Sequence, residues 1–241
     1  MTTTNSPKSS VEEIRTRFDN DVERFANLET GQSATIDSPL ALELVAEAAA
    51  VSTPHATRLL DIGCGAGNYS LKLLARLPQL EVTLVDLSQP MLARAEQRLR
   101  DAGCRKVTTL QADVRELTLA ANSTDIIVAA AVLHHLRTDD EWQSVFAILA
   151  VALSPGGSIW IFDLLDTATP ALRDMFQRRY GEYLVSLGGA EYHDKVFAYI
   201  EREDTPRSIV EQLDLLRRAG IAQLEILHKN GPFGAFGGIK S

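Results

Sequence analysis

Cysteine is scarce in this sequence, because Cys64 and Cys104 are the only two among 241 residues. So few thiols exclude a disulfide framework and indicate a reducing compartment. Long apolar segments are also missing: the longest uncharged apolar run, Ile126 to Leu133, is far shorter than the roughly 20 residues of a membrane span. The polar residues 1–10 lack the apolar core of a signal peptide. These absences predict a cytoplasmic protein with no membrane partner.

Positive charge is also in short supply. The 24 lysines and arginines are outnumbered by 32 acidic residues, which gives a net charge of −8. A general nucleic-acid binder is usually basic, so the charge balance favours a small-molecule partner over nucleic acid. With 45% hydrophobic and 23% charged residues and no internal repeat, the chain suits one α/β domain with a sizeable core.

The central motif is an apolar run, Leu59–Ile62, followed by glycine at every second position, Gly63, Gly65 and Gly67. The segment Asn68–Leu77 then has the leucine spacing of an amphipathic helix. Glycines let a backbone approach a ligand closely, and a helix N-terminus offers free N–H groups. Strand, glycine loop and helix together predict the first unit of a βαβ nucleotide site, with an ordinary tight turn as the alternative.

The glycine spacing argues against a dinucleotide site. The G-x-G-x-x-G fingerprint would require glycine where this chain has Asn68. Asp61, directly before the loop, is a poor neighbour for a pyrophosphate and a suitable one for a cationic ligand. The segment Asp61–Gly67 resembles the first motif of the class I S-adenosylmethionine-dependent methyltransferases, an acid followed by G-x-G-x-G.

A second acid supports a nucleoside ligand. Asp86 ends the predicted strand 81–85 and lies 19 residues beyond Gly67 (86 − 67). An acid about 20 residues after the loop accepts hydrogen bonds from ribose hydroxyls. The resemblance further implies that Asp113 accepts from the adenine amino group, with the backbone of Val114 beside the ring. Small side chains such as Ala130, in the predicted strand 125–131, leave room for the methionine part.

The predicted cofactor is therefore S-adenosyl-L-methionine, with S-adenosyl-L-homocysteine as its product. The predicted cofactor-binding residues are Asp61, Gly63, Gly65, Gly67, Asp86, Leu87, Asp113, Val114 and Ala130.

Two adjacent histidines, His134 and His135, follow the predicted strand 125–131. Neighbouring histidines do not easily chelate one metal together, and no third ligand lies nearby in the sequence, so no metal is predicted. One histidine could face the mouth of the pocket as a base or a substrate contact, and His134 is the predicted catalytic residue. The alternative is a helix-start pair that makes backbone hydrogen bonds.

Two segments lie outside the βα repeat. An amphipathic helix is predicted over 11–27, and residues 1–36 form either a lid over the cofactor or a structural flank. Residues 37–241 form the cofactor-binding domain, which contains an insert at 166–199 with a helix from Pro170 that is interrupted at Gly188-Gly189. The insert could place Arg178, Arg179, Tyr180 and Tyr183 around a substrate, or it could be a solvated cap helix.

The predicted fold is a Rossmann-like doubly wound α/β sheet of the class I methyltransferase type. It is mostly parallel, with an antiparallel C-terminal hairpin made by 222–228 and 233–239. The predicted activity is methyl transfer to a small molecule. Alternatives are an enzyme that modifies the cofactor itself, as carboxy-S-adenosylmethionine synthases do, and a non-catalytic cofactor-binding module; a nicotinamide oxidoreductase is disfavoured by the glycine spacing. The acceptor and the oligomeric state stay open, with a homodimer among the options.

Overall fold

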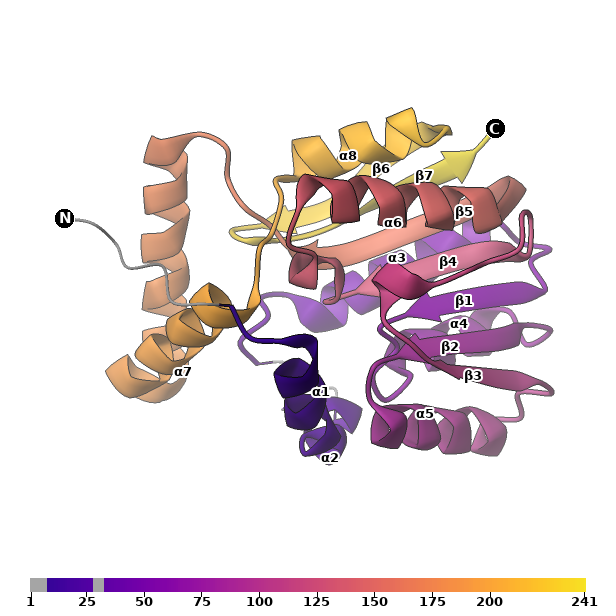
Figure 1. The fold of residues 1–241 in the computed structure, drawn as a ribbon, viewed down its shortest axis with the longest axis horizontal. Helices are drawn as coiled ribbons and strands as arrows, with labels where there is room; N and C mark the ends of the chain where they lie inside the picture. Colours follow the sequence, from indigo (N-terminus) through magenta and orange to yellow (C-terminus); the bar gives the residue numbers. More distant parts are fainter. Residues whose placement is uncertain (1–7, 28–32) are drawn as a thin grey trace.

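The computed structural model describes residues 8–27 and 33–241, and within them seven strands form one sheet flanked by helices on both faces (Figure 1). The strand order is β3-β2-β1-β4-β5-β7-β6. The first five pair in parallel, and β7 is antiparallel to both β5 and β6, which confirms the predicted fold class. The strands are β1 Arg58–Ile62, β2 Glu81–Asp86, β3 Val107–Gln111, β4 Thr124–Ala130, β5 Leu153–Leu164, β6 Ile221–Asn230 and β7 Phe233–Lys240.

Successive side chains of the central strands point to opposite faces of the sheet, and they divide the core into two clusters, one on each face. Leu59 of β1 packs into the first cluster, whereas its neighbours Leu60 and Ile62 pack into the second. Val128 and Ala129 of β4 divide in the same way. Successive side chains of a strand point to opposite faces, so a continuous apolar run buries both faces of a parallel strand.

Helices α3, α4 and α5 contribute to the first cluster, and α6 and α8 contribute to the second. Figure 1 shows α6 and α8 on the near face of the sheet. No helix in the described part of the chain is long and apolar enough to cross a membrane. The helices are α1 Val11–Asp19, α2 Val22–Ala26, α3 Ser38–Ser52, α4 Asn68–Arg76, α5 Gln89–Asp101, α6 Asp139–Ala152, α7 Pro170–Glu203 and α8 Ile209–Arg218, with short 3-10 turns η1 Val114–Glu116 and η2 Leu133–His135.

The N-terminal helix differs from the prediction, because it is broken into α1 and α2. At the break, the backbone N–H of Asn20 donates to the carbonyl of Arg17 and that of Asp21 donates to the carbonyl of Phe18, while the side chain of Asn20 donates to the carbonyl of Thr16. Asparagine and aspartate side chains compete with the helix for backbone groups, and Asn20-Asp21 brings two of them together. The sequence also predicts a polar break after this helix, at 29–33, and most of that segment lies outside the described residues.

Residues 154–157, whose sequence Ser-Pro-Gly-Gly is typical of a turn, lie within β5 as a bulge. The register with β4 moves from Thr124 opposite Leu153 to Ile126 opposite Ser158, so most of the intervening residues of β5 have no partner. Gly156 allows this with a φ of 75°. The interruption predicted in α7 is confirmed, since Gly188 and Gly189 have non-helical dihedral angles.

The order of the strands fixes where a ligand would lie. From β1 the chain adds β2 and β3 on one side of the sheet, and it then returns to add β4 and β5 on the other side of β1. The order of strand addition therefore reverses between β1 and β4. Ligands of open α/β sheets bind at the carboxyl ends of the strands beside such a switch point. The glycine loop after β1 and the turn η2 after β4 both start at this edge.

Candidate active site

A cavity of about 500 Å³ occupies the predicted edge of the sheet. Its walls come from three parts of the chain: the glycine loop and the start of α4, the segments that follow β2, β3 and β4, and the N-terminal residues from Lys8 to Phe25. Pockets of this size hold small molecules, and its lining is mostly apolar with a few polar groups.

Gly63 and Gly65 of the glycine loop both have a positive φ, but their surroundings differ. Gly63 has a φ of 63°, and a Cβ there would lie 2.5 Å from Cγ2 of Val132. Gly65 has a φ of 49°, and a Cβ added to it would meet no heavy atom within 4 Å, so its backbone faces open space in the cavity wall. Gly67 does not line the cavity; it is the N-cap of α4 and packs against Ala95.

Asp86 ties the loop to the end of β2. Its Oδ2 accepts a hydrogen bond of 2.8 Å from the backbone N–H of Gly65, and its Oδ1 accepts one of 2.9 Å from Ser88 N–H. Burial raises the pKa of this carboxyl to about 6, although the backbone donors oppose the shift. Each oxygen keeps a further lone pair, so a ligand hydroxyl could still be accepted.

Asp61 is buried beneath the loop, where Ser70 Oγ donates to its Oδ2 at 2.6 Å. Burial, together with the nearby charge of Asp86, raises the pKa of Asp61 to about 7. The hydroxyl of Tyr69 is also buried beside the cavity and has no hydrogen-bond partner among the described residues. A cationic ligand group would stabilise the ionised form of Asp61.

Asp113 follows β3 and lines the cavity, but its carboxylate is already engaged by Arg115. The backbone N–H and Nε of Arg115 both donate to Oδ1, at 2.9 and 2.8 Å. Burial would raise the pKa of Asp113, but these hydrogen bonds lower it below its usual value. Leu87, Val114 and Ala130 line the same cavity.

The N-terminal helices form the wall opposite the glycine loop. Val11, Ile14, Phe18 and Phe25 line the cavity from α1 and α2. Side-chain bonds anchor this wall at both ends: Asn68 Nδ2 donates to Phe25 O at 2.9 Å, and Arg17 pairs with the buried Glu203 at 2.8 Å. These apolar side chains shield the cavity from solvent.

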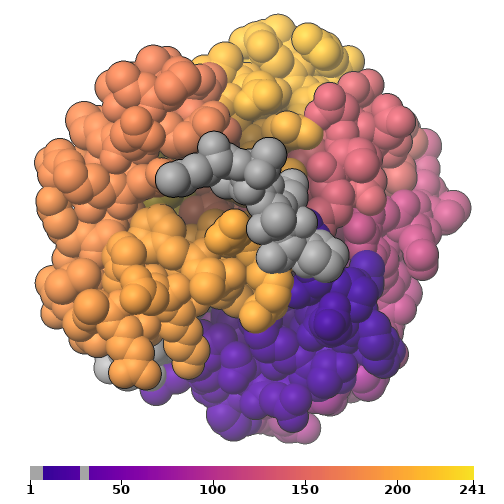
Figure 2. Space-filling view, turned by 60° about the vertical axis from the view of Figure 1, so that its left-hand side comes forward, coloured from indigo at the N-terminus to yellow at the C-terminus, as the bar shows by residue number. Residues whose placement is uncertain are grey.

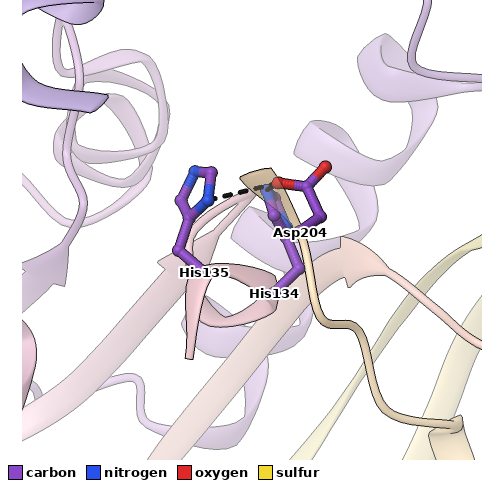
Figure 3. A group of neighbouring side chains, drawn as sticks. All are labelled: His134, His135 and Asp204. Atoms are coloured by element: carbon purple, nitrogen blue, oxygen red, sulfur yellow. Dashed lines mark ion pairs between the residues drawn. The ribbon is translucent and has the colours of Figure 1, made fainter. Parts of the chain in front are cut away.

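The two histidines have different surroundings (Figure 3). His134 is buried and is not among the cavity-lining residues; its Nδ1 contacts Asp163, whose other oxygen accepts from the His134 backbone N–H. Figure 3 shows both rings beside Asp204. His135 lines the cavity. Its Nδ1 lies 3.2 Å from Asp204 Oδ1 and 3.4 Å from the Glu203 carbonyl, and its Nε2 has no partner among the described residues.

The surroundings of the two imidazole rings shift their pKa values in opposite directions. Burial alone would lower the pKa of His134, but the carboxylates of Asp163 and Asp204 raise it to about 9. Burial and the neighbouring His134 charge lower the pKa of His135. Because the Glu203 carbonyl can only accept, we assign the proton of neutral His135 to Nδ1, which leaves Nε2 bare.

Asp204 supplies the third side chain that the sequence did not place near the histidines, and the group His134, His135 and Asp204 has ligand atoms within 4.8 Å of one another. A dication there would lie near Lys8 and Arg137, whose charges already act on this region. The carboxylate of Asp204, the one acid in the group, already interacts with the protonated ring of His134. Added positive charge would therefore be unfavourable.

The insert lies beside a different cavity. None of its residues from 166 to 199 lines the first cavity, but Arg173, Phe176 and Tyr180 line a second one of about 380 Å³ at the end of β5. Figure 2 shows this hollow between the halves of α7 (orange). Tyr180 and Tyr183 bond the carbonyls of Ala34 and Ser33, while Arg178 pairs with Glu182.

Among the predicted cofactor residues, all except Gly67 line the first cavity. The sequence did not indicate several others: Lys8, Tyr69, Arg115 and Arg137. Of the two histidines considered for the mouth of the pocket, it is His135 that lines the cavity. The apolar stripe of α1 was visible as a periodic pattern, but nothing in it showed which surface it covers.

A family profile described as a methyltransferase domain matches residues 59–157. The ubiquinone/menaquinone biosynthesis C-methyltransferase UbiE of Syntrophotalea carbinolica is 30% identical over 189 residues, which cover 78% of this chain and 77% of that protein. The carboxy-S-adenosyl-L-methionine synthase of Trichodesmium erythraeum is 26% identical over 188 residues, which cover 77% and 73% of the two chains.

Among solved structures, an O-methyltransferase family protein from Burkholderia thailandensis matches with a TM-score of 0.68 at 19% identity. That match covers 99% of this chain and 65% of the other. At this identity the likeness shows the fold, whereas the match to the C-methyltransferase spans most of both sequences at a higher identity. The chain belongs to the class I S-adenosylmethionine-dependent methyltransferase family.

Proposed function

We propose that this protein transfers a methyl group from S-adenosylmethionine to a small-molecule acceptor. The observation that carries the proposal is the continuity of the first cavity. It runs from the cofactor motif to a wall made by α1 and by the turn that holds His135. A ligand held at the glycine loop and a second ligand beneath α1 would therefore share one space.

The cofactor fits the polar groups in a definite order along this edge. Asp113 and Val114 would hold the adenine, Asp86 would accept from the ribose, and Asp61 would face the cationic amino acid part. The sulfonium would then lie near the ends of β1 and β4, beside Ala130. Each of these contacts is an expectation from the chemistry of the donor set.

Methyl transfer requires that the acceptor atom be aligned with the carbon–sulfur bond of the cofactor and that water be excluded. The acceptor's electron pair forms a bond to the methyl carbon, the carbon–sulfur pair stays on sulfur, and S-adenosylhomocysteine leaves. A sulfonium already activates the methyl group, so an in-line approach in a shielded cavity supplies much of the acceleration. The apolar side chains of α1 supply that shielding.

An acceptor that must lose a proton needs a base, and we propose that this base comes from the histidine pair. His135 lines the cavity with an unpartnered Nε2, and its lowered pKa keeps it neutral and able to accept a proton near pH 7. The sequence-based assignment of this role to His134 stays a prediction; the buried contacts with Asp163 and Asp204 give that ring a positioning role in this proposal.

A small acceptor is favoured by the enclosure of the cavity beneath α1 and α2. A similar fold belongs to the 1,6-didemethyltoxoflavin-N1-methyltransferase of Burkholderia thailandensis, with a TM-score of 0.64 and 17% identity over 99% of this chain and 93% of that one. Its structure holds 1,6-didemethyltoxoflavin and S-adenosylhomocysteine, which shows that this architecture can enclose a small heteroaromatic acceptor.

Calorimetry with S-adenosylmethionine, S-adenosylhomocysteine, NAD and ATP tests the cofactor, and mass spectrometry of the ligand that co-purifies identifies what the cavity takes. We expect the first two ligands to bind and the other two not to bind. A panel of small nucleophiles should then yield a methylated product. Cofactor binding with no product from any acceptor would favour the non-catalytic alternative, and a product that remains attached to the cofactor sulfur would favour cofactor modification.

A further inference from the structure

Two basic side chains, Lys8 and Arg137, line the first cavity near each other. Burial is the largest cause that lowers the pKa of Lys8, and repulsion from Arg137 is the next. Burial also lowers the pKa of Arg137. Lys8 is an exposed residue and Arg137 is half-buried, so water compensates part of their charge and a bound anion would compensate more.

The protein gives these two cations only neutral partners. Lys8 Nζ donates to the backbone carbonyl of Glu201 at 2.6 Å and to that of Asp204 at 2.5 Å. Arg137 donates to the carbonyls of Glu203 and Ser9 and to the hydroxyl of Thr205. Within residues 8–27 and 33–241, neither forms an ion pair with a carboxylate.

The nearby carboxylates are committed elsewhere. Asp204 faces the two histidines, at 3.2 Å from His135 and 3.7 Å from His134. Glu203 pairs with Arg17 at 2.8 Å. Glu141 pairs with Arg115 and accepts from the backbone N–H of Arg137 and its neighbour, not from the Arg137 guanidinium.

Both cations keep donors for a ligand. An ammonium has three N–H groups, of which Lys8 uses two, and a guanidinium has five, of which Arg137 uses three. The start of α1, at Ser10 and Val11, lines the same cavity, but its N-terminus is already closed by a capping box with Glu13, so the two side chains are the cations that a ligand would meet. Ligand anions are favoured where such groups converge.

We propose that the first cavity binds a carboxylate-bearing ligand, with the carboxylate held between Lys8 and Arg137. This inference rests on the proposed function and makes its acceptor an anionic small molecule. A carboxylate suits the site because it is planar and can take two parallel hydrogen bonds from a guanidinium. It would also add a direct ion pair to two cations that the nearby carboxylate of Asp204 attracts only from a distance.

A matched pair of probes tests the proposal. 4-Hydroxybenzoate and 4-hydroxybenzamide have nearly the same shape, and only the first carries a carboxylate. With protein saturated with S-adenosylhomocysteine, we expect calorimetry to show the acid binding roughly tenfold or more tightly than the amide. Lys8→Met and Arg137→Met should each remove most of this preference.

Lys229→Met is the control. Lys229 also has a burial-lowered pKa and bonds only a backbone carbonyl, that of Gly231 at 2.9 Å, but it does not line the cavity. It should leave the preference unchanged. A cooperative urea unfolding transition like that of wild type would show that both variants are folded. A loss of S-adenosylhomocysteine affinity in both variants, with no preference of wild type for the acid, would assign the two cations to the cofactor's own carboxylate and overturn the proposal.

The carboxylate could instead be carried by the cofactor, so a second arm compares carboxy-S-adenosylmethionine with S-adenosylmethionine. Tighter binding of the carboxylated cofactor, lost in Arg137→Met, would keep the anion site and assign the carboxylate to the cofactor. If wild type shows no preference for the carboxylated member of either pair, or if the preference survives both substitutions, the proposal is overturned. Absence of S-adenosylhomocysteine binding would instead overturn the proposed function.

Discussion

The carboxylate of Asp86 and the backbone N–H of Gly65 are joined by a hydrogen bond of 2.8 Å that links the end of β2 to the glycine loop of β1. The same carboxylate accepts from Ser88 at the start of α5. One side chain therefore shapes the loop and is the expected partner of the ribose. Its removal should affect both binding and folding.

Asp86→Ala should weaken S-adenosylhomocysteine binding by roughly ten- to a hundredfold, because a hydrogen bond to a charged group is worth ~1.5–3 kcal/mol. It should also lower the free energy of unfolding by about 1–3 kcal/mol, since two buried N–H groups lose their acceptor. Calorimetry and urea denaturation measure the two effects. Asp174→Ala, at an exposed position of α7, should change neither. An unchanged dissociation constant would show that Asp86 only shapes the loop.

Cofactor binding should release protons near neutral pH. Burial raises the pKa of Asp61 to about 7 in the free protein, and a cationic amino group beside it would favour the ionised form. Affinity should therefore rise as pH increases through about 7. Calorimetry in buffers of different ionisation enthalpy measures the proton release, and Asp61→Asn should abolish the part that Asp61 contributes. Binding that is independent of buffer and pH would contradict the contact with Asp61.

The same raised pKa predicts the pH dependence of stability without ligand. The folded-state pKa of Asp61 lies above its unfolded value, so its protonated form is favoured in the folded protein. That stabilisation is complete below about pH 4 and is lost as pH rises toward and through 7. Asp61→Asn should flatten this component of a plot of unfolding free energy against pH. If the unfolding free energies of wild type and Asp61→Asn depend on pH in the same way between pH 4 and 8, the pKa of Asp61 is not raised in the folded protein.

Helices α1 and α2 should gain protection from hydrogen exchange when S-adenosylhomocysteine binds. They line the cavity through Val11, Ile14, Phe18 and Phe25, so a ligand would extend their buried contacts. Exchange is compared with and without the ligand over residues 11–26. Helix α8, at Ile209–Arg218, does not line the first cavity, so its protection should not change and it serves as the internal control. Equal protection in both states would identify α1 and α2 as a fixed flank.

His135→Asn should reduce turnover of a hydroxyl or amine acceptor by roughly a hundredfold or more, the usual contribution of a general base. Because the pKa of His135 is lowered, the neutral ring persists below pH 6.5, and the turnover number should fall only at more acidic pH. Stopped assays across pH 5–8 measure this. A large loss in His134→Asn with none in His135→Asn would support the original assignment, and no loss in either would show that transfer runs by positioning alone.

The cofactor half of the site was predictable because each signal lies within one βα unit. Asp61 and Gly65 are fixed by a local loop, and Asp86 follows its strand at a spacing that the topology requires. The contacts at His135 were not predictable, since Asp204 reaches it from 69 residues downstream (204 − 135). Nor could periodicity show that α1, and not the insert, would wall the cavity, because an apolar stripe does not identify the surface that it covers.

The bond from Ser9 N–H to Arg202 O, at 3.0 Å, joins two ends of the chain that the methyltransferase-domain match at 59–157 does not contain. The wall above the acceptor is thus assembled from segments that precede and follow the cofactor motif, and none of α1 belongs to that motif. On the proposed function, much of the acceptor's wall and the cofactor motif therefore lie in different segments of the chain. A chimera that carries the α1 segment of a related enzyme should change its acceptor preference more than its affinity for S-adenosylmethionine.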